Sequence, residues 1–288
     1  MRLFTDIRQV STLSRGKYEQ ACIDSVDHLY IGDDTILCKV LTKYKMYVDS
    51  RDMGITPHLV MDGYWESWVT RLLGKIVKPG FVCLDVGANF GYFSILMSEL
   101  CGPNGKTLAI EPNSRVATLL RATSFMNGGK FEVVEAAIAA SNGEAILSVN
   151  DKELGGGTIK NNDPIPGRSQ YTVPTISIDE LVKSKGLTRV DVMKIDVEGV
   201  EPLVFSGMEG TIAANPDIQL IIEYTPSIYT DPALFTEYLF SRFNVQQITD
   251  VDQLKQLDNT SVAALLEIHD HADLYLTRKK FHSISWTI

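Results

Sequence analysis

The sequence contains no long apolar run, and no apolar segment near its first methionine could serve as the core of a signal peptide. Apolar stretches such as Leu220-Ile221-Ile222 are far shorter than the roughly 20 residues that a helix needs to cross a bilayer. The opening segment, MRLFTDIRQVSTLSRG, mixes polar and apolar residues throughout. We therefore expect a cytoplasmic protein without a membrane span.

The sequence also has few basic clusters, and its cysteines lack the spacing of zinc ligands. The net charge is -9, and no basic run is longer than residues 278–280. Because an acidic surface repels phosphate backbones, we expect no nucleic-acid partner. The 4 cysteines show no CxxC spacing, which favours reduced thiols over a zinc site or a disulfide framework.

Alternating strand and helix patterns dominate the chain from residue 81 onward. They predict a Rossmann-like α/β fold, with a mainly parallel sheet and helices on both faces. Residues 1–60 are predicted to form an appendage with a β-hairpin at 35–41 and 45–49, ahead of a single domain at 61–288. Expected helices are 64–77, 92–100, 114–126 and 200–214; expected strands are 81–86, 107–110, 131–134, 190–195 and 218–223, with an antiparallel pair at 243–248 and 273–277.

Parallel sheets bind ligands beyond the carboxyl ends of their strands. In this chain those ends carry carboxylates, namely Asp85, Glu111, Glu135, Asp196 and Glu223. The sequence therefore places the site at this edge of the sheet before any family is considered.

The first strand runs into a glycine turn, DVGANFG, at residues 85–91. Gly87 and Gly91 allow a tight turn and a close approach of a ligand to the backbone, including Ala88 and Asn89 between them. The spacing is not the GxGxxG of dinucleotide enzymes, and Asp85 would repel a pyrophosphate. The carboxylate of Asp85 suits a ligand with an amino group, such as S-adenosyl-methionine.

The second strand ends in Glu111-Pro112-Asn113, about twenty residues beyond the turn. A carboxylate here can accept hydrogen bonds from both ribose hydroxyls of a nucleoside. It can equally act as a favourable charge at a helix N-terminus. Ala136 and Ala137 follow the third strand, and such small residues leave room for an adenine ring or simply pack.

A second polar cluster, Lys194-Ile195-Asp196-Val197-Glu198, lies at the end of the fourth predicted strand. A lysine within an apolar strand is costly to bury unless it is paired. We expect Asp196 or Glu198 to act as general base toward an acceptor hydroxyl, with Lys194 orienting the carboxylate. Asp196 is also assigned to the cofactor site. Alternatively, Glu198 and the nearby Glu201 only decorate the first turn of a helix. A divalent ion held by the acids is possible but is not required.

Glycine, asparagine and proline are concentrated in residues 155–167, which predicts a loop. The loop is either a lid over the acceptor or a tolerated surface insertion. The pair His269 and His271 could suggest a metal, but without a third ligand nearby it favours a solvated loop.

The blocks FVCLDVGANFGYFSILMSEL, AIEPN, VPTISIDELV, VMKIDVEGVEPLVFSGM and LIIEYTP together resemble the FkbM family of methyltransferases, over residues 64–226. The resemblance implies the seven-stranded class I methyltransferase fold and S-adenosyl-methionine as cofactor. It also implies transfer of the methyl group to a hydroxyl of a sugar, glycan or natural product. The residues that match the family motifs are Asp85, Gly87, Asn89, Gly91, Glu111, Asn113, Lys194, Asp196, Glu198 and Gly199, and Glu66 matches a Tyr-x-Glu that precedes them.

Two other functions remain open at this point. A nicotinamide-dependent oxidoreductase could use a similar sheet, although the missing GxGxxG and the position of Asp85 count against it. A non-catalytic protein could keep Asp85 and Glu111 for cofactor binding and lack turnover. Calorimetry of nucleotide binding distinguishes the oxidoreductase from a methyltransferase. A screen of acceptors with labelled methyl donor distinguishes the non-catalytic protein from an enzyme.

Overall fold

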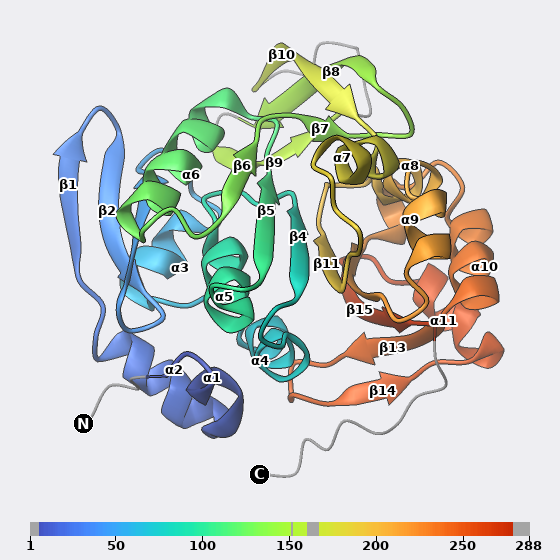
Figure 1. Cartoon of the computed structure of the whole chain (residues 1–288), viewed down its shortest axis with the longest axis horizontal. Coiled ribbons are helices and arrows are strands. Elements are labelled where there is room, and N and C mark those ends of the chain that lie inside the picture. Colours follow the sequence, from blue (N-terminus) through green and yellow to red (C-terminus); the bar gives the residue numbers. More distant parts are fainter. Residues whose placement is uncertain (1–5, 151, 160–166, 279–288) are drawn as a thin grey trace.

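The computed structural model of the chain describes residues 6–150, 152–159 and 167–278 (Figure 1). One large sheet forms the centre, with helices packed on both faces, so the predicted α/β fold is confirmed. Within the described residues, no helix is long and apolar enough to cross a membrane.

The large sheet has eight strands in the order β14-β13-β15-β12-β11-β4-β5-β6. The strands from β12 to β6 run parallel, and β15 runs antiparallel between β12 and β13. The expected antiparallel pair is therefore present. The strands are β4 (Val82–Val86), β5 (Lys106–Ile110), β6 (Glu132–Val134), β11 (Val192–Ile195), β12 (Gln219–Tyr224), β13 (Asn244–Ile248), β14 (Leu254–Gln256) and β15 (Ala272–Thr277).

The eighth strand, β14, goes beyond the expected seven. It is only three residues long, carries two polar residues and pairs with the edge of β13. No periodic pattern can develop over such a length, so local sequence could not predict it.

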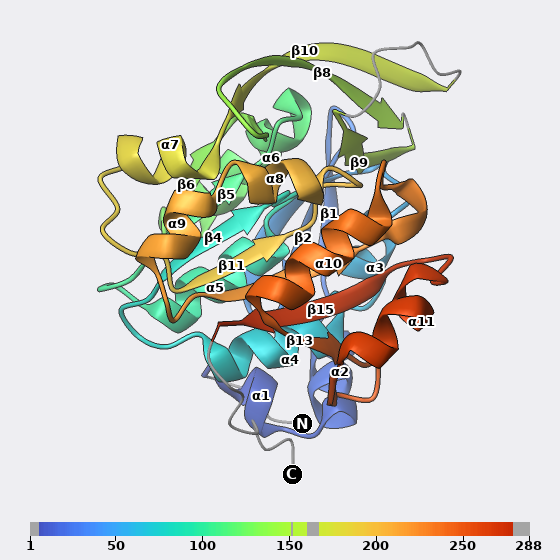
Figure 2. The same ribbon diagram turned by 90° about the vertical axis from the view of Figure 1, so that its right-hand side faces the viewer.

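Alternate residues of the central strands contribute to two hydrophobic layers. Cys83, Ala109 and Val192 face α4 (Ser67–Ile76), α5 (Tyr92–Cys101) and α6 (Ser114–Met126). Leu84, Leu108 and their equivalents face α7 (Ile178–Ser184), α8 (Glu201–Ser206), α9 (Glu209–Ala214), α10 (Pro232–Arg242) and α11 (Val262–Leu266). Figure 2 looks onto this second layer, with α9 and α10 in front of the sheet.

The helix expected at 200–214 is in fact two helices, α8 and α9, separated at Gly207 and Met208. A Cβ at Gly207 would lie 2.4 Å from the carbonyl oxygen of Ala139, so this position packs directly on a neighbouring backbone. The carboxylate of Asp179 accepts hydrogen bonds from the amides of Gly210 and Thr211 and so starts the second helix. Asp179 thus has a structural role away from the strand ends.

The N-terminal region adds a small sheet in the order β1-β2-β3. The predicted hairpin is confirmed as β2 and β3, and β1 extends it. This sheet packs on α6, where the Tyr47 amide donates to Thr123 Oγ1 at 3.0 Å. The elements are α1 (Gln9–Thr12), α2 (Arg15–Ile23), β1 (His28–Gly32), β2 (Thr35–Val40), β3 (Tyr44–Asp49) and α3 (Thr56–Met61).

A third sheet, in the order β7-β10-β8-β9, is inserted after β6. Its strands are β7 (Ala137–Ile138), β8 (Gly143–Asn150), β9 (Glu153–Thr158) and β10 (Arg168–Ile176). The prediction of a loop at 155–167 is therefore wrong for residues 155–158, which form part of β9. Residues 160–166 lie outside the described part of the chain. The three consecutive glycines suggested a loop, but pairing with β8 makes them a strand.

Candidate active site

The glycine turn after β4 is packed against two neighbouring strands. The amides of Gly87 and Ala88 both donate to the carbonyl oxygen of Ile110, at 3.0 and 2.9 Å. Gly87 has a φ of 80°, and a Cβ built there would lie 1.7 Å from the carbonyl oxygen of Asp196. Only glycine fits at this position, where the turn after β4 meets the loop after β11.

Glu111 links the turn to the next strand. It is 4% exposed, and its carboxylate accepts from the amides of Asn89 at 3.0 Å and Asn113 at 2.8 Å. Burial raises its pKa to about 7, although these two hydrogen bonds favour the charged form. Glu111 therefore holds the two sequence motifs together at the edge of the sheet.

Asp85 lies behind the turn. Ser94 Oγ donates to one of its oxygens at 2.5 Å, and the side chain is 1% exposed. Burial raises the pKa of this carboxyl, and the charge of Lys194 acts in the opposite direction. The neighbouring motif residue Asn113 caps α6 and donates through Nδ2 to the carbonyl oxygen of Leu154. Both residues therefore support the site from outside its cavities.

Lys194 is a buried cation with a defined partner. Its side chain is 5% exposed, and Nζ lies 2.7 Å from Asp196 Oδ2 and 4.8 Å from the centre of the Phe93 ring. Burial by itself would lower its pKa, but the charges of Asp196, Glu66 and Asp85 outweigh burial and raise it. These charges therefore hold Lys194 as an ammonium in contact with the Asp196 carboxylate.

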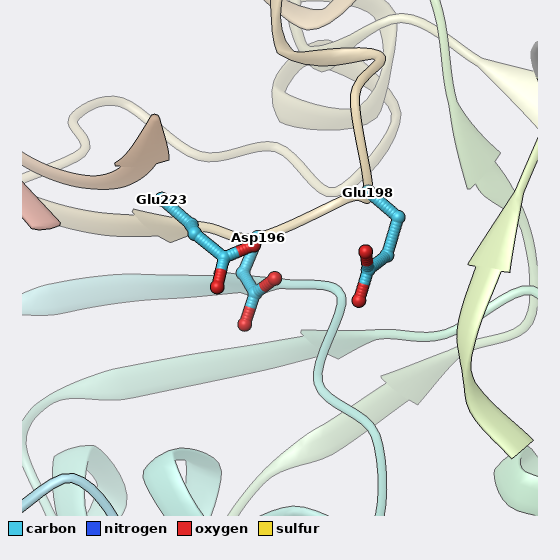
Figure 3. Close-up of side chains that lie close together, drawn as sticks. All are labelled: Asp196, Glu198 and Glu223. Carbon is cyan, nitrogen blue, oxygen red and sulfur yellow. The ribbon is translucent and has the colours of Figure 1, made fainter. Parts of the chain in front are cut away.

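Three carboxylates from two strand ends meet beside this pair. One ligand oxygen from each of Asp196, Glu198 and Glu223 lies within 4.8 Å of the others, and Figure 3 shows the side chains pointing toward a shared space. The charge of Asp196, with burial and the charge of Glu198, raises the pKa of Glu223 to about 11. Oxygen ligands of this kind suit a divalent ion. His271 Nδ1 lies 3.9 Å from Glu223, so the histidine faces the rim of this trio.

Two cavities share Gly87, Gly155 and Asp196 in their walls. The larger has a volume of about 240 Å³, and its wall includes Glu66, Lys194, Glu198 and Glu223. The smaller, of about 30 Å³, lies between Glu111, Pro112, Ala136 and Ala137 on one side and β9 on the other. The polar cluster and the glycine turn therefore line the same larger cavity, and the smaller cavity adjoins it at the three shared residues.

β9 lies across this region, held by hydrogen bonds on both sides. The Leu154 amide donates to Asp52 Oδ1 at 3.1 Å, and its carbonyl oxygen accepts from Asn113. A Cβ at Gly155 would lie 1.9 Å from the side chain of Asn89. The glycines of β9 therefore allow its backbone to approach the turn after β4 directly.

Comparison with known proteins gives a family for this chain. The model of the FkbM methyltransferase domain matches residues 85–281, which is more than half of the chain. The chain belongs to the FkbM methyltransferase family. The sequence-based resemblance is thereby confirmed, and the oxidoreductase alternative loses its support.

Relatives of this FkbM-family chain include the hexuronic acid methyltransferase AglP of Haloferax volcanii, 30% identical over 147 residues. That match spans 51% of this chain and 58% of the relative. Similar solved structures include precorrin-6y C5,15-methyltransferase of Geobacter metallireducens, at 12% identity and a TM-score of 0.42, covering 74% of this chain and 88% of the other. Another is the Pyrococcus abyssi tRNA (uracil-54, C5)-methyltransferase in complex with S-adenosyl-L-homocysteine, at 10% identity and a TM-score of 0.42, with coverages of 85% and 44%.

Most of the site residues predicted for this FkbM-family protein do come together. The cavity walls contain Glu66, Gly87, Ala88, Asn89, Gly91, Glu111, Pro112, Ala136, Ala137, Lys194, Asp196 and Glu198. Sequence analysis missed Asp52 and Trp65 as wall residues, and it noted Glu223 only as a strand-end acid. It placed Gly155 and Gly156 in a segment for which a lid over the acceptor was one of two interpretations. The glycine triplet was a usable signal, whereas nothing local marks Asp52.

Because this FkbM-family protein buries several carboxyl groups, we expect its free energy of unfolding to fall as the pH rises from 5 to 8. Burial raises the pKa of Glu111 and Glu201 to about 7, and burial with the charge of Asp273 raises that of Glu66 to about 8. The unfolded values lie near 4.3. Each of these three carboxyls contributes stability that is fully present below its unfolded pKa. That contribution is lost as the pH rises through the folded pKa, by at most about 1.4 kcal/mol per pH unit for each carboxyl.

Urea unfolding of the ligand-free protein across this pH range measures the effect. The Glu111→Gln variant is the matched control, because it removes one titrating group and should flatten the profile. Asp85 and Asp196 face Glu111 and remain in this variant. A free energy of unfolding that rises from pH 5 to pH 8 would contradict the prediction.

Proposed function

We propose that the protein transfers the methyl group of S-adenosyl-methionine to a hydroxyl oxygen of a sugar, a glycan or a natural product. The observation that carries the proposal is the shared cavity. A buried lysine–carboxylate pair and two further carboxylates open onto the same space as the glycine turn. A binding-only protein has no need for a buried Lys194 aimed at a carboxylate.

The residues present fit this cofactor. Gly87 leaves no room for a side chain where the turn meets Asp196, and Asn89 Oδ1 is buried with no hydrogen-bond partner among the described residues. Glu111 would accept hydrogen bonds from the ribose hydroxyls, and Ala136 and Ala137 would border the adenine. Glu66 and Asp196 would lie on the side of the amino acid end, where carboxylates favour an amino group. When bound, the cofactor supplies an electrophilic methyl group.

The chain's own residues would hold the acceptor and remove its proton. Asp196 or Glu198 accepts the proton of the hydroxyl as it attacks, because a sugar hydroxyl is a poor nucleophile at neutral pH. The Nζ group of Lys194, at 2.7 Å, keeps Asp196 in one orientation. Glu223 has a raised pKa and is protonated near neutrality, which limits repulsion within the trio. Orientation of the acceptor supplies the remaining part of the rate.

Two observations bear on the acceptor, one on the class of substrate and one on the group that receives the methyl. The relative named a hexuronic acid methyltransferase favours a sugar substrate. The wall of the larger cavity contains three carboxylates, Asp52, Asp196 and Glu198, against one lysine, in addition to Glu66 and Glu223 with their raised pKa values. This charge disfavours a carboxylate next to the methyl group and leaves a hydroxyl as the better acceptor.

We further propose that residues 1–60 form an appendage to the domain at 61–288 and contribute to acceptor choice. Asp52, Gly54 and Ile55 come from this region and line the larger cavity. Asp52 also holds Leu154, so the appendage and β9 together border the entrance.

The cofactor assignment predicts a large effect at Glu111. Glu111→Ala removes a charge-assisted acceptor and releases the amides of Asn89 and Asn113, so S-adenosyl-methionine binding should weaken at least about tenfold. Titration calorimetry with S-adenosyl-methionine, S-adenosyl-homocysteine and NAD measures this. Glu135→Ala is the matched control, because Glu135 also follows a parallel strand but is paired with Arg121.

The control should bind the cofactor like the wild type. Tight NAD binding without S-adenosyl-methionine binding would overturn the proposed function. Labelled methyl donor with a panel of sugars and glycans then tests transfer, and cofactor binding without turnover on any acceptor would support the non-catalytic alternative.

A further inference from the structure

Glu201 begins α8, three residues after Glu198, and in the sequence it looks like an ordinary acid in the first turn of a helix. Its environment is different from that of such an acid. The residue is only 1% exposed, and Oε1 accepts hydrogen bonds from the amides of Val197 at 3.1 Å and Gly199 at 3.4 Å. The carboxylate therefore points back into the turn that precedes the helix.

The turn that Glu201 holds has an unfavourable backbone. Glu198 has a φ of 54° and Gly199 a φ of 90°, so both lie in the left-handed region. For a residue with a side chain this conformation is strained and needs support from its surroundings. The start of the turn is fixed separately, because the Asp196 amide donates to the carbonyl oxygen of Val86. Glu201 supplies the hydrogen bonds on either side of Glu198.

Glu201 also lies beside a residue that supports the third carboxylate. Burial raises the pKa of Tyr229, and the charge of Glu201 adds to this effect. The Tyr229 hydroxyl accepts from the Thr225 amide at 3.1 Å and donates to the carbonyl oxygen of Glu223 at 3.4 Å. Glu201 thus lies between the turn of Glu198 and the end of β12, the two segments that bring the carboxylates together.

We propose that Glu201 is a positioning residue whose buried carboxylate fixes the left-handed turn and thereby aims Glu198 into the acceptor cavity. This inference rests on the proposed function, in which Glu198 faces the acceptor. Capping of α8 does not explain the contacts, because both amides belong to residues that precede the helix. The matched residue is Glu209, which begins α9 but has a side chain 43% exposed and contacts Tyr238 and Arg242.

The first test measures kcat, acceptor KM, cofactor Kd and melting temperature for Glu201→Ala, Glu201→Gln and Glu209→Ala. Glu201→Ala should lower kcat about 10–100-fold with cofactor Kd unchanged, because misplacement by about 1 Å is costly in rate. Glu201→Gln keeps one carbonyl oxygen for both amides and should recover most of the rate. Glu209→Ala should change only the melting temperature. Wild-type kcat in Glu201→Ala, or an equal loss in the glutamine variant, would overturn the proposal.

A double-mutant cycle and an exchange measurement complete the test. If Glu201 acts through Glu198, adding Glu201→Ala to Glu198→Gln should cause little further loss, whereas independent, multiplicative losses would overturn the proposal. Hydrogen exchange of the Val197 and Gly199 amides should accelerate at least about tenfold in Glu201→Ala and not in Glu209→Ala. Unchanged exchange overturns the role of Glu201 even if the protein methylates, and accelerated exchange without any turnover contradicts the proposed function instead. If Glu201→Ala does not fold, the same measurements on Glu201→Asp decide, because its shorter side chain should not reach both amides.

Discussion

Asp196→Asn and Glu198→Gln are expected to slow methyl transfer, with a loss of about 10²–10⁴-fold in the variant that lacks the general base. Both carboxylates line the larger cavity, and Lys194 Nζ lies 2.7 Å from Asp196. An amide has nearly the shape of the carboxylate but cannot accept a proton at neutral pH, so the fold should remain. Cofactor binding should remain in Glu198→Gln. Asp196→Asn also removes a charge placed beside the amino group of the cofactor, so its rate is measured at saturating cofactor. Single-turnover rates, cofactor affinity and melting temperature measured together separate chemistry from stability.

Glu209→Gln is the control for the Glu198 substitution, because Glu209 lies on α9 and contacts Tyr238 and Arg242 instead of the cavity. If the acids only stabilise a helix start, each variant should lose about 0.5–2 kcal/mol of stability and keep the normal rate. Normal single-turnover rates in both variants would exclude a general base at these positions. Orientation of the acceptor would then remain as the source of the rate.

A divalent ion at the three carboxylates predicts another pattern. Asp196, Glu198 and Glu223 offer oxygens within 4.8 Å of one another, a set that suits magnesium or a related ion. In that case chelation should abolish wild-type turnover and added magnesium should restore it. Turnover that is unchanged by chelation would assign the carboxylates to the acceptor and the proton alone.

Gly87→Ala is expected to abolish high-affinity cofactor binding, with a loss well above tenfold. The added Cβ would lie 1.7 Å from the carbonyl oxygen of Asp196, so the turn after β4 and the loop after β11 must move apart by roughly 1 Å or more. Such a displacement alters the backbone that should border the cofactor, together with Asp196 itself. Calorimetry of the purified variant measures its affinity for the cofactor, and its melting temperature measures the loss of stability.

Gly80→Ala provides a closely matched control. Gly80 has a φ of 82°, nearly the value of 80° at Gly87, but a Cβ there would meet no atom within 4 Å. Both variants should therefore lose roughly 1–2 kcal/mol through backbone strain, and only Gly87→Ala should lose the cofactor. Equal cofactor affinity in the two variants would show that Gly87 is needed for its backbone conformation and not for the close approach.

The sequence by itself determined the class of fold and the edge of the sheet that carries the site. Apolar strands alternating with amphipathic helices require crossover connections, so the acids that follow β4, β5, β11 and β12 must lie at the same edge. The glycine turn is also local information, because Gly87 and Gly91 directly after an apolar strand allow a tight turn and a close approach of a ligand. These features depend on neighbours within a few residues or on the order of the elements, and both can be deduced from a one-dimensional pattern.

Only the tertiary structure decided which distant groups complete the site. The Asp52 carboxylate accepts a hydrogen bond from the Leu154 amide, 102 residues later in the sequence. β9 lies against Asn89 because its glycines have no side chains there. From the sequence, decoration of a helix start was one interpretation of Glu201, but in the structure its buried carboxylate points toward Val197 and Gly199. Such contacts depend on how separate elements pack in three dimensions, and no local periodicity or propensity encodes that packing.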